Sequence, residues 1–525
     1  MRQWCVYRIM LRFTSLFAAM ALSSAAANFN ILDYGAKNDG SAPATEAFRA
    51  AIQAAKAAGG GTVFVPAGRY VTGPIELVSN LILYFDAGAV VAFPAQRLPF
   101  TRGREQGVEC LTPVPLIGGH NLENVTIAGR GTLTTNNADW MKLMGRTDRT
   151  GPEGSAFGAK WEQLLQMLEL KKPVPEEFYR EVAPELRPSF ILTMDSRNVL
   201  IDGLHFAGSS MWTIHLLYTD NATVRNVIIE TYPGVHTDGI AVDSSRNVRI
   251  SDCYIDTGDD GIVIKSGKDA DGLRVNRPSE NISITNCTVH RAHGAVTLGS
   301  ETSGWIRNLA ASNITCDGTQ MGIRLKSRRG RGGGVEDVRF TGWTMRDVGT
   351  AINVTNYYLM EGETPSTTAE PVSARTPVFR NIAVNGVTVL GARLAIDVEG
   401  LPEMPVAGLR ITDFAGTAKA GVKAYNTAGL ELRGVRVDAE NGPAFLIRDS
   451  RELTLDGVAG HGAAGTPLVR LDHCPGASVR NSRAGGVLLS AGVGELKAVA
   501  VSGNSGKSEE SGKSYPMTAE RPTEK

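Results

Sequence analysis

Four short segments between residues 232 and 326 concentrate the side chains that could do chemistry. Glycoside hydrolysis needs one carboxyl group that protonates the leaving oxygen and a second that activates a water molecule. Three neighbouring aspartates would supply both roles, and their mutual repulsion should raise at least one pKa and keep a proton available. An aspartate pair alone also occurs in turns and in calcium sites, so this interpretation depends on all four segments together. They are His236-Thr237-Asp238, Gly258-Asp259-Asp260, Ala292-His293-Gly294 and Arg324-Leu325-Lys326.

The last two segments add basic side chains to the aspartates. Arg324 and Lys326 alternate with apolar residues, so both should lie on the outer face of a strand. They could hold the carboxylate of an acidic sugar, a task that suits a guanidinium group, or they could simply balance the charge of the aspartates. His293 could be a hydrogen-bonded turn residue, or it could tune the proton affinity of a catalytic aspartate.

A repeated pattern of an Asn or Asp, a short alternating strand and a turn runs through most of the chain. Its copies are mostly 22 to 34 residues apart, and one copy is too short to bury its own apolar face. Stacked copies would bury it, which predicts an all-β fold, a right-handed parallel β-helix. A sandwich of antiparallel hairpins is the alternative, but few two-residue hairpin turns are present. Copies begin at Asn124, Asn198, Asn221, Asn247, Asn281, Asn308, Asp337 and Asn381.

Stacking would bring residues that are distant in sequence to the same face. Equivalent positions on neighbouring coils lie about 4.8 Å apart. Asp238 and Asp259 are 21 residues apart, so they can face one groove on consecutive coils. Cys253 and Cys287 each follow their repeat asparagine by six residues and should therefore stack inside the cylinder.

The two ends of the chain depart from the repeat. Residues 1–27 combine early arginines, an apolar run and a small-residue site at Ala25–Ala27, which predicts a secretory signal peptide and a secreted or periplasmic protein. The β-helix catalytic domain should span residues 28–502. Residues 503–525 contain few apolar side chains and predict a disordered tail.

Two helical stretches accompany the β-helix. A short N-terminal capping helix is expected between Ala44 and Ala58, with an apolar stripe that would cover the first open coil. Residues 138–187 should form a partly helical insertion on the outside of the solenoid. The stripe consists of Phe48, Ala51, Ile52 and Ala55.

Composition excludes some classes of function. The 54 basic and 54 acidic residues give no basic footprint for nucleic acid, and the apolar run of the signal is too short to span a bilayer, so we expect no membrane association after signal cleavage. The cysteines match no zinc or disulfide framework. We expect a monomer with no cofactor.

At these four segments the sequence resembles glycoside hydrolase family 28, the polygalacturonases and their relatives. The family motifs are Asn-Thr-Asp, Gly-Asp-Asp, Gly-His-Gly and Arg-Ile-Lys, and their counterparts appear here in the same order. The resemblance implies an inverting mechanism without a metal. Asp259 would be the general acid, Asp238 and Asp260 would hold and deprotonate the attacking water, and His293 would support this cluster.

The resemblance also implies a substrate site. Arg324 and Lys326 would bind the carboxylate of a galacturonate unit, and a downstream tyrosine would assist, with Tyr357 the first choice and Tyr358 the second. His236 stands where the family has asparagine, which puts the substrate subsite in doubt more than the reaction. The insertion at 138–187 could close one end of the groove and favour attack at chain ends.

The sequence therefore predicts a hydrolase of galacturonate-containing pectin. A rhamnogalacturonan or modified-galacturonan hydrolase of the same family is the nearest alternative, and His236 keeps it open. A calcium-dependent polysaccharide lyase and a non-catalytic glycan-binding β-helix are further alternatives. The glycan-binding alternative would leave the three aspartates unexplained.

Overall fold

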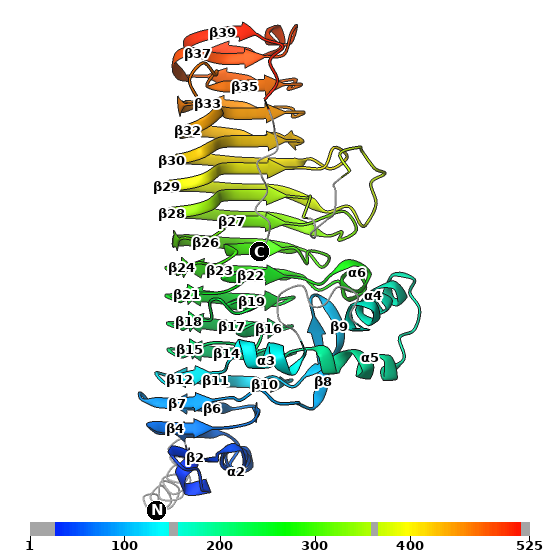
Figure 1. Cartoon of the computed structure of the whole chain (residues 1–525), viewed down its shortest axis with the longest axis vertical. Coiled ribbons are helices and arrows are strands. Elements are labelled where there is room, and N and C mark those ends of the chain that lie inside the picture. Colours follow the sequence, from blue (N-terminus) through cyan, green and yellow to red (C-terminus); the bar gives the residue numbers. More distant parts are fainter. Residues whose placement is uncertain (1–26, 146–155, 359–365, 516–525) are drawn as a thin grey trace, which may run out of the picture.

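The computed structural model of the chain describes residues 27–145, 156–358 and 366–515. Parallel pairing joins 37 strands into one continuous sheet, which winds into a right-handed parallel β-helix (Figure 1). The predicted fold is therefore confirmed. Residues 1–26 of the predicted signal peptide lie outside the described part, and the signal remains a prediction.

Three ladders of strands run along the β-helix, and in each ladder a strand pairs with its counterpart on the next coil. We call the ladder that carries the predicted aspartates and cations the site ladder. It consists of β5 (Ile75–Glu76), β10 (Ile117–His120), β13 (Ile191–Met194), β16 (Ile214–Leu217), β19 (Ile240–Asp243), β22 (Ile262–Lys265), β25 (Gly294–Gly299), β27 (Met321–Lys326), β28 (Gly334–Thr355), β29 (Val378–Glu399), β30 (Val406–Tyr425), β32 (Glu431–Arg448), β35 (Val469–Asp472), β37 (Arg483–Ala491) and β39 (Ser505–Glu510).

The other two ladders complete each coil and share the long strands β28, β29, β30 and β32, which bend from one ladder to the next. The second ladder adds β1 (Asn28–Asn30), β3 (Gly61–Val65), β6 (Leu81–Phe85), β11 (Glu123–Gly129), β14 (Arg197–Asp202), β17 (Asp220–Arg225), β20 (Arg246–Ser251), β23 (Ser279–Thr285), β26 (Ile306–Asp317), β33 (Thr454–Asp456), β36 (Ser478–Arg480) and β38 (Ala500–Ser502). The third adds β2 (Asp39–Pro43), β4 (Gly68–Val71), β7 (Ala89–Ala92), β12 (Thr132–Thr134), β15 (His205–Ala207), β18 (Ile228–Glu230), β21 (Tyr254–Asp256), β24 (Thr288–His290) and β34 (Ala459–His461), while β31 (Thr427–Ala428) pairs with β30.

Helices lie only outside the coils among the described residues, and none of these helices is long and apolar enough to cross a membrane. An antiparallel hairpin, β8 (Phe100–Glu105) and β9 (Val108–Pro113), also projects from the solenoid (Figure 1). The helices are α2 (Thr45–Ala57), α3 (Asn137–Leu143), α4 (Ala156–Glu169), α5 (Glu176–Val182) and α6 (Asp269–Val275), with 3₁₀ turns η1 (Ile31–Tyr34), η2 (Ala183–Glu185) and η3 (Leu496–Ala498).

The core follows the two-residue period of each strand. In β22, Ile262 and Ile264 point into the cylinder, whereas Lys265 points outward. Cys253 and Cys287 are free thiols buried in the same core, as the repeat predicted. The apolar ladders therefore fill the cylinder and leave the outer side of each strand available for polar side chains.

The recurring asparagines have a conformational reason. Asn198 and Asn221 adopt a left-handed backbone, with φ of 56° at both positions, which asparagine tolerates better than most residues. The side-chain amide of Asn221 donates to Asn198 Oδ1 over 2.7 Å, and Asn281 donates in the same way to Asn247 over 3.0 Å. These amides connect the turns of neighbouring coils and keep the coils in register.

The insertion between β12 and β13 contains α3, α4, α5 and η2. Together with the β8–β9 hairpin it forms a second apolar core beside the solenoid, at the level of β16 to β22 (Figure 1). The buried members of this core are Val108, Cys110, Trp161, Leu164, Val182 and Leu186.

Both ends of the described chain pack onto the solenoid. Helix α2 buries Phe48, Ala51, Ile52 and Ala55 in the main core; its function as a lid stays a prediction. The expected disordered tail at 503–525 is wrong for Ser505–Glu510, which forms β39 and pairs with β37. Backbone pairing with the last coil and two hydrogen bonds to the Glu510 carboxylate, from Gly494 N and Leu496 N, hold the strand, although all six side chains are exposed. Residues 516–525 lie outside the described part.

Candidate active site

The predicted acidic and imidazole residues lie on neighbouring coils, where each turn leads into a strand of the site ladder. Asp238 lies just before β19. The pair Asp259 and Asp260 lies just before β22, and His293 lies just before β25. Main-chain bonds fix their spacing, because Gly239 N donates to Asp260 O and His293 N donates to Asp259 O, each over 3.0 Å. Stacking of coils therefore brings together residues up to 55 positions apart.

Two glycines of these segments are required by the close approach of the coils. A Cβ atom at Gly258 would lie 1.9 Å from Gly234 O. At Gly294 it would lie 2.1 Å from Thr297 Oγ1 and 2.9 Å from Asp260 Oδ1. A side chain at either position would separate the coils or displace a carboxylate.

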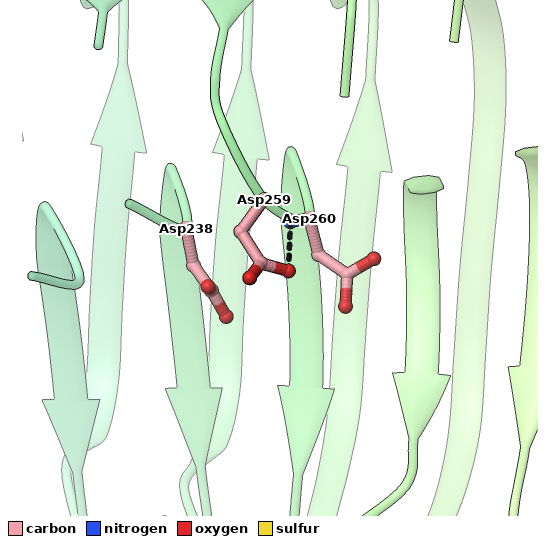
Figure 2. Close-up of side chains that lie close together, drawn as sticks. All are labelled: Asp238, Asp259 and Asp260. Carbon is pink, nitrogen blue, oxygen red and sulfur yellow. Dashed lines mark hydrogen bonds between the residues drawn. The ribbon is translucent and has the colours of Figure 1, made fainter. Parts of the chain in front are cut away.

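Asp238, Asp259 and Asp260 project into one shared space (Figure 2). A carboxyl oxygen from each lies within 4.8 Å of the others. The Asp260 amide donates to Asp259 Oδ1 over 2.9 Å. Asp238 and Asp260 are buried, whereas the side chain of Asp259 remains 17% exposed. The structure thus brings the three predicted aspartates together and leaves Asp259 the most accessible of them.

Asp260 is surrounded by donors from the next two coils. Lys326 Nζ lies 2.9 Å from its Oδ2 atom, and Arg324 Nη1 lies 3.5 Å from its Oδ1 atom. The Thr297 hydroxyl donates to Oδ1 over 2.8 Å. Arg324 and Lys326 both point outward from β27, as the alternation predicted. These contacts favour the ionised form of Asp260.

His293 contacts the most exposed aspartate. Its Nδ1 atom lies 3.2 Å from Asp259 Oδ1, and its side chain is buried. The alternative that His293 is only a satisfied turn residue therefore does not describe its contacts, because its partner is a carboxylate of the cluster.

The pKa values of the three aspartates are shifted in different directions. Burial and the charge of Asp259 raise the pKa of Asp238 well above its ordinary value, although Lys265 opposes the shift. At least one pKa of the cluster is therefore raised, as the repulsion argument predicted, and the cluster can retain a proton at mildly acidic pH.

The pKa values of the other two carboxyl groups, Asp259 and Asp260, are lowered. Burial alone would raise the pKa of Asp259, but the hydrogen bond and charge of His293 outweigh it and lower this pKa well below its ordinary value. At Asp260, Lys326 and Arg324 outweigh burial and lower the pKa. The raised pKa of the unliganded cluster thus belongs to Asp238 and not to Asp259, the expected general acid.

Sequence reasoning missed Lys265, the last residue of β22, which contacts Asp238 of the preceding coil. Its Nζ atom lies 3.5 Å from Asp238 Oδ2 and 3.1 Å from Glu301 Oε2, and it lies 4.4 Å from the ring centre of Trp212. Burial opposes its charge, but Glu301 and Asp238 outweigh burial and raise its pKa. The alternation along β22 that places Ile262 inside would have identified Lys265 as an outward residue beside the aspartates.

The insertion reaches the site through its two ends. Asn137, at its start, donates to Val235 O over 3.3 Å and accepts from Val235 N over 3.0 Å. Arg187, at its end, is buried and donates to the same carbonyl over 2.8 Å, and its Nη2 atom lies 3.0 Å from His236 Nδ1. His236 lies close enough to Asp259 to interact with it electrostatically.

The first choice of tyrosine, Tyr357, lies away from the cations. Its ring lies 5.7 Å from the Arg329 guanidinium carbon and 6.1 Å from the ring of Tyr425. The ring of Tyr358 instead lies 5.0 Å from Lys326 Nζ. The chain has left strand β28 at this point, so the alternation of a strand no longer decides which neighbour faces the site.

Tyr358 is also close to the second cation of the site. Its ring centre lies 5.7 Å from the guanidinium carbon of Arg324. Three carboxylates at the observed spacing could also ligate a divalent cation. Lys326 and Lys265, however, already bring positive charge to Asp260 and Asp238.

Comparison with known proteins gives consistent matches along the chain. The model of the glycosyl hydrolases family 28 matches residues 181–426. A model described as rhamnogalacturonase A/epimerase, pectate lyase-like, matches residues 28–96, in the first coils. The first match contains all the residues placed at the site above except Asn137.

Individual relatives extend the similarity over most of the β-helix. A probable polygalacturonase of Vitis vinifera is 29% identical over 444 residues, which cover 82% of this chain and 82% of that protein. An exo-poly-alpha-D-galacturonosidase of Dickeya chrysanthemi is 27% identical, covering 71% of this chain and 64% of the enzyme. The crystal structure of a hyperthermoactive exopolygalacturonase from Thermotoga maritima superposes with a TM-score of 0.72 at 33% identity, covering 78% of this chain and 91% of that one. Our chain therefore belongs to family 28 of the glycosyl hydrolases.

Proposed function

We propose that this glycoside hydrolase cleaves α-glycosidic bonds in a galacturonate-containing pectic polysaccharide by an inverting, metal-independent mechanism. The observation that carries the proposal is the cluster of three carboxylates, with oxygens within 4.8 Å of one another, beside the two cations of β27. The relatives named as polygalacturonases support the choice of substrate.

Asp259 is assigned as the general acid. It is the most exposed of the three aspartates, so it can reach the glycosidic oxygen, and it lies against His293. In the unliganded cluster the retained proton lies mainly on Asp238, and the coupling between the neighbouring carboxyl groups allows it to move to Asp259. In the proposed step this proton passes from the Asp238 carboxyl group to the Asp259 carboxylate. Asp259 then donates it to the leaving oxygen as the bond to the anomeric carbon breaks.

Asp260 is assigned as the general base, with Asp238 as the second group that holds the attacking water. Asp260 is kept ionised by Lys326 and Arg324, so it can accept a proton. The water loses that proton to Asp260 and forms the new bond to the anomeric carbon from the face opposite the leaving oxygen. Single displacement of this kind inverts the anomeric configuration.

Arg324, Lys326, Tyr358 and His236 are assigned to substrate binding. Arg324 and Lys326 are buried and sit beside the base, where a uronate carboxylate can pair with them. The ring of Tyr358 lies next to both cations and can pack against the sugar. Tyr357, assigned to this role from the sequence, contacts Arg329 instead and is left out of the site.

Exo action is the finer part of the proposal. The insertion is anchored by Asn137 and Arg187 at Val235, directly before His236. A wall at this position would close the groove on the side of the preceding coils and admit only a chain end. The names of the Dickeya and Thermotoga enzymes agree with this mode of attack.

Digestion of defined oligogalacturonates tests the proposal. We expect release of monogalacturonate from the start of the reaction, new reducing ends, and no effect of EDTA. Unsaturated products that absorb in the ultraviolet and disappear with EDTA would instead identify a calcium-dependent lyase. Activity confined to rhamnogalacturonan would identify the alternative specificity, and binding without new reducing ends would identify a glycan-binding protein.

Export and assembly complete the proposal. We infer a monomer that is secreted or periplasmic, since the segment at 1–27 has the pattern of a signal peptide. N-terminal sequencing of protein exported by a bacterial host, together with its mass in solution, tests both statements.

A further inference from the structure

Arg187 makes contacts that go beyond anchoring the insertion. Its side chain is 4% exposed, and Nη1 donates to Ser210 O and to Val235 O, each over 2.8 Å. A second nitrogen, Nη2, lies 3.0 Å from His236 Nδ1. The guanidinium group therefore connects the end of the insertion to the imidazole that precedes Asp238.

The chemistry of this contact fixes the tautomer of His236. A guanidinium group has five N–H donors and no acceptor. The contact of 3.0 Å is therefore a hydrogen bond only if Nδ1 of His236 carries no proton. The ring hydrogen then sits on Nε2, at the edge of the imidazole that faces away from Arg187.

The backbone conformation of His236 also helps to fix the position of its ring. Its φ of 55° lies in the left-handed region, which histidine and asparagine adopt more readily than most residues. His236 is half-buried and lies two residues before Asp238 in the chain. The ring is thus held by the buried guanidinium group of Arg187, on the turn that leads to Asp238.

We propose that Arg187 is a positioning residue that holds His236 as the Nε2–H tautomer, so that the imidazole presents an N–H donor to an oxygen of the sugar bound beside Asp259. The sugar is the terminal galacturonate unit in the exo mode of attack, and the acceptor is one of its hydroxyl or carboxylate oxygens. This inference rests on the proposed function, and it assigns specificity to a residue contributed by the insertion.

A double-mutant cycle separates this role from a structural one. Arg187→Met should lower kcat/KM for trigalacturonate about tenfold or more in the wild-type background. In a His236→Asn background, where an amide donor needs no fixed tautomer, the same change should cost less than about twofold. Equal losses in the two backgrounds would mean that Arg187 acts only by anchoring the insertion, and would overturn the proposal.

Histidine ¹⁵N chemical shifts test the tautomer in the unmodified protein. The signals of His236 are identified by their loss in His236→Asn. We expect an unprotonated Nδ1 and a protonated Nε2, so a protonated Nδ1 or a cationic ring would contradict the proposal. This measurement decides the question even if Arg187→Met fails to fold.

The outcomes distinguish this inference from the proposed function. A wild-type protein that does not hydrolyse oligogalacturonates would contradict the function. A wild-type protein that hydrolyses them, with equal Arg187→Met losses in both backgrounds, would contradict only the role of Arg187.

Discussion

His293 Nδ1 lies 3.2 Å from Asp259 Oδ1, and this contact connects two of the four predicted segments. The imidazole approaches from the next coil and acts on the aspartate that is most exposed. It lowers the pKa of Asp259 in the unliganded protein. The neighbours of Asp259 therefore determine its proton affinity, and the proposed acid would receive its proton from within the cluster.

Replacement of the acid tests this relationship. Asp259→Asn should lower kcat by about 10²- to 10⁴-fold, the range associated with loss of general acid–base catalysis. The variant should still fold, but its thermal unfolding should shift in the destabilising direction at pH 7, because the lowered pKa of Asp259 means that its ionised form contributes stability. Asp256→Asn is the matched control on the same coil, because Asp256 pairs with Arg291 outside the cluster, and it should retain most activity. Comparable losses of kcat in both variants would argue against Asp259 as the acid.

Two isosteric variants in the cluster should change stability in opposite directions. Asp238 has a raised pKa, so above its ordinary value of 3.8 the unfolded chain loses a proton that the folded protein keeps, and rising pH destabilises the fold. Asp238→Asn removes this effect and should stabilise the protein at pH 7 by about 1 kcal/mol or more, with the gain vanishing as pH falls toward 4.

Asp260→Asn provides the opposite case. Its lowered pKa means that the ionised side chain contributes stability above the ordinary value, and this contribution is lost as pH falls through the folded pKa. The variant should therefore be destabilised at pH 7 by about 1 kcal/mol or more. Thermal unfolding of both variants at pH 4 and pH 7 measures the two effects, and shifts of the same sign at pH 7 would contradict the account.

Lys265 should set the alkaline limit of activity. Its charge lowers the pKa of Asp238, so Lys265→Met should raise that pKa further and move the basic limb of the kcat/KM profile to higher pH. The profile of Lys268→Met is the control, since Lys268 lies three residues further along and beside Asp269. A basic limb that moves to lower pH in Lys265→Met would show that its charge does not act on the retained proton.

The two adjacent tyrosines should differ in their effect on substrate binding. Tyr358→Ala removes a ring that lies beside Lys326 and Arg324 and should raise KM for oligogalacturonates about threefold to tenfold. Tyr357→Ala should act mainly on stability, because this ring is buried against Tyr425. Steady-state kinetics and thermal unfolding of both variants check the assignment; a larger rise in KM for Tyr357→Ala would restore the first choice.

The sequence predicts the solenoid well because the repeat has simple physical causes. Asparagines with left-handed φ mark the turns, and alternation places Arg324 and Lys326 outside while Ile262 lies inside. The stacking of coils alone is then enough to predict that Asp238 and Asp259 lie close together.

Other features depend on contacts that no local pattern contains. Arg187 reaches His236 only because the insertion folds back onto the solenoid, and the ring of Tyr358, not that of Tyr357, is the one found beside Lys326 after the strand has ended. The last strand, Ser505–Glu510, has exposed side chains and no apolar face, so only its backbone pairing with β37 reveals it.

The spacing of the carboxylates makes the stereochemical course a demanding test. In glycosidases with two carboxyl groups, separations of about 5–5.5 Å accompany retention and about 6.5–9.5 Å accompany inversion. Here three carboxyl groups have oxygens within 4.8 Å, which by that rule would favour retention. The family mechanism and the third carboxylate lead to the opposite expectation, because Asp238 and Asp260 can hold a water between them and none of the three needs to attack the sugar.

Proton NMR of the first products from trigalacturonate, recorded before mutarotation, therefore tests the central claim most directly. The account predicts that the newly released reducing end appears first as the β-anomer and converts slowly to the equilibrium mixture. A reducing end that appears first as the α-anomer would show double displacement through a covalent intermediate, and would contradict the assignment of the three aspartates to an acid and a water-activating pair.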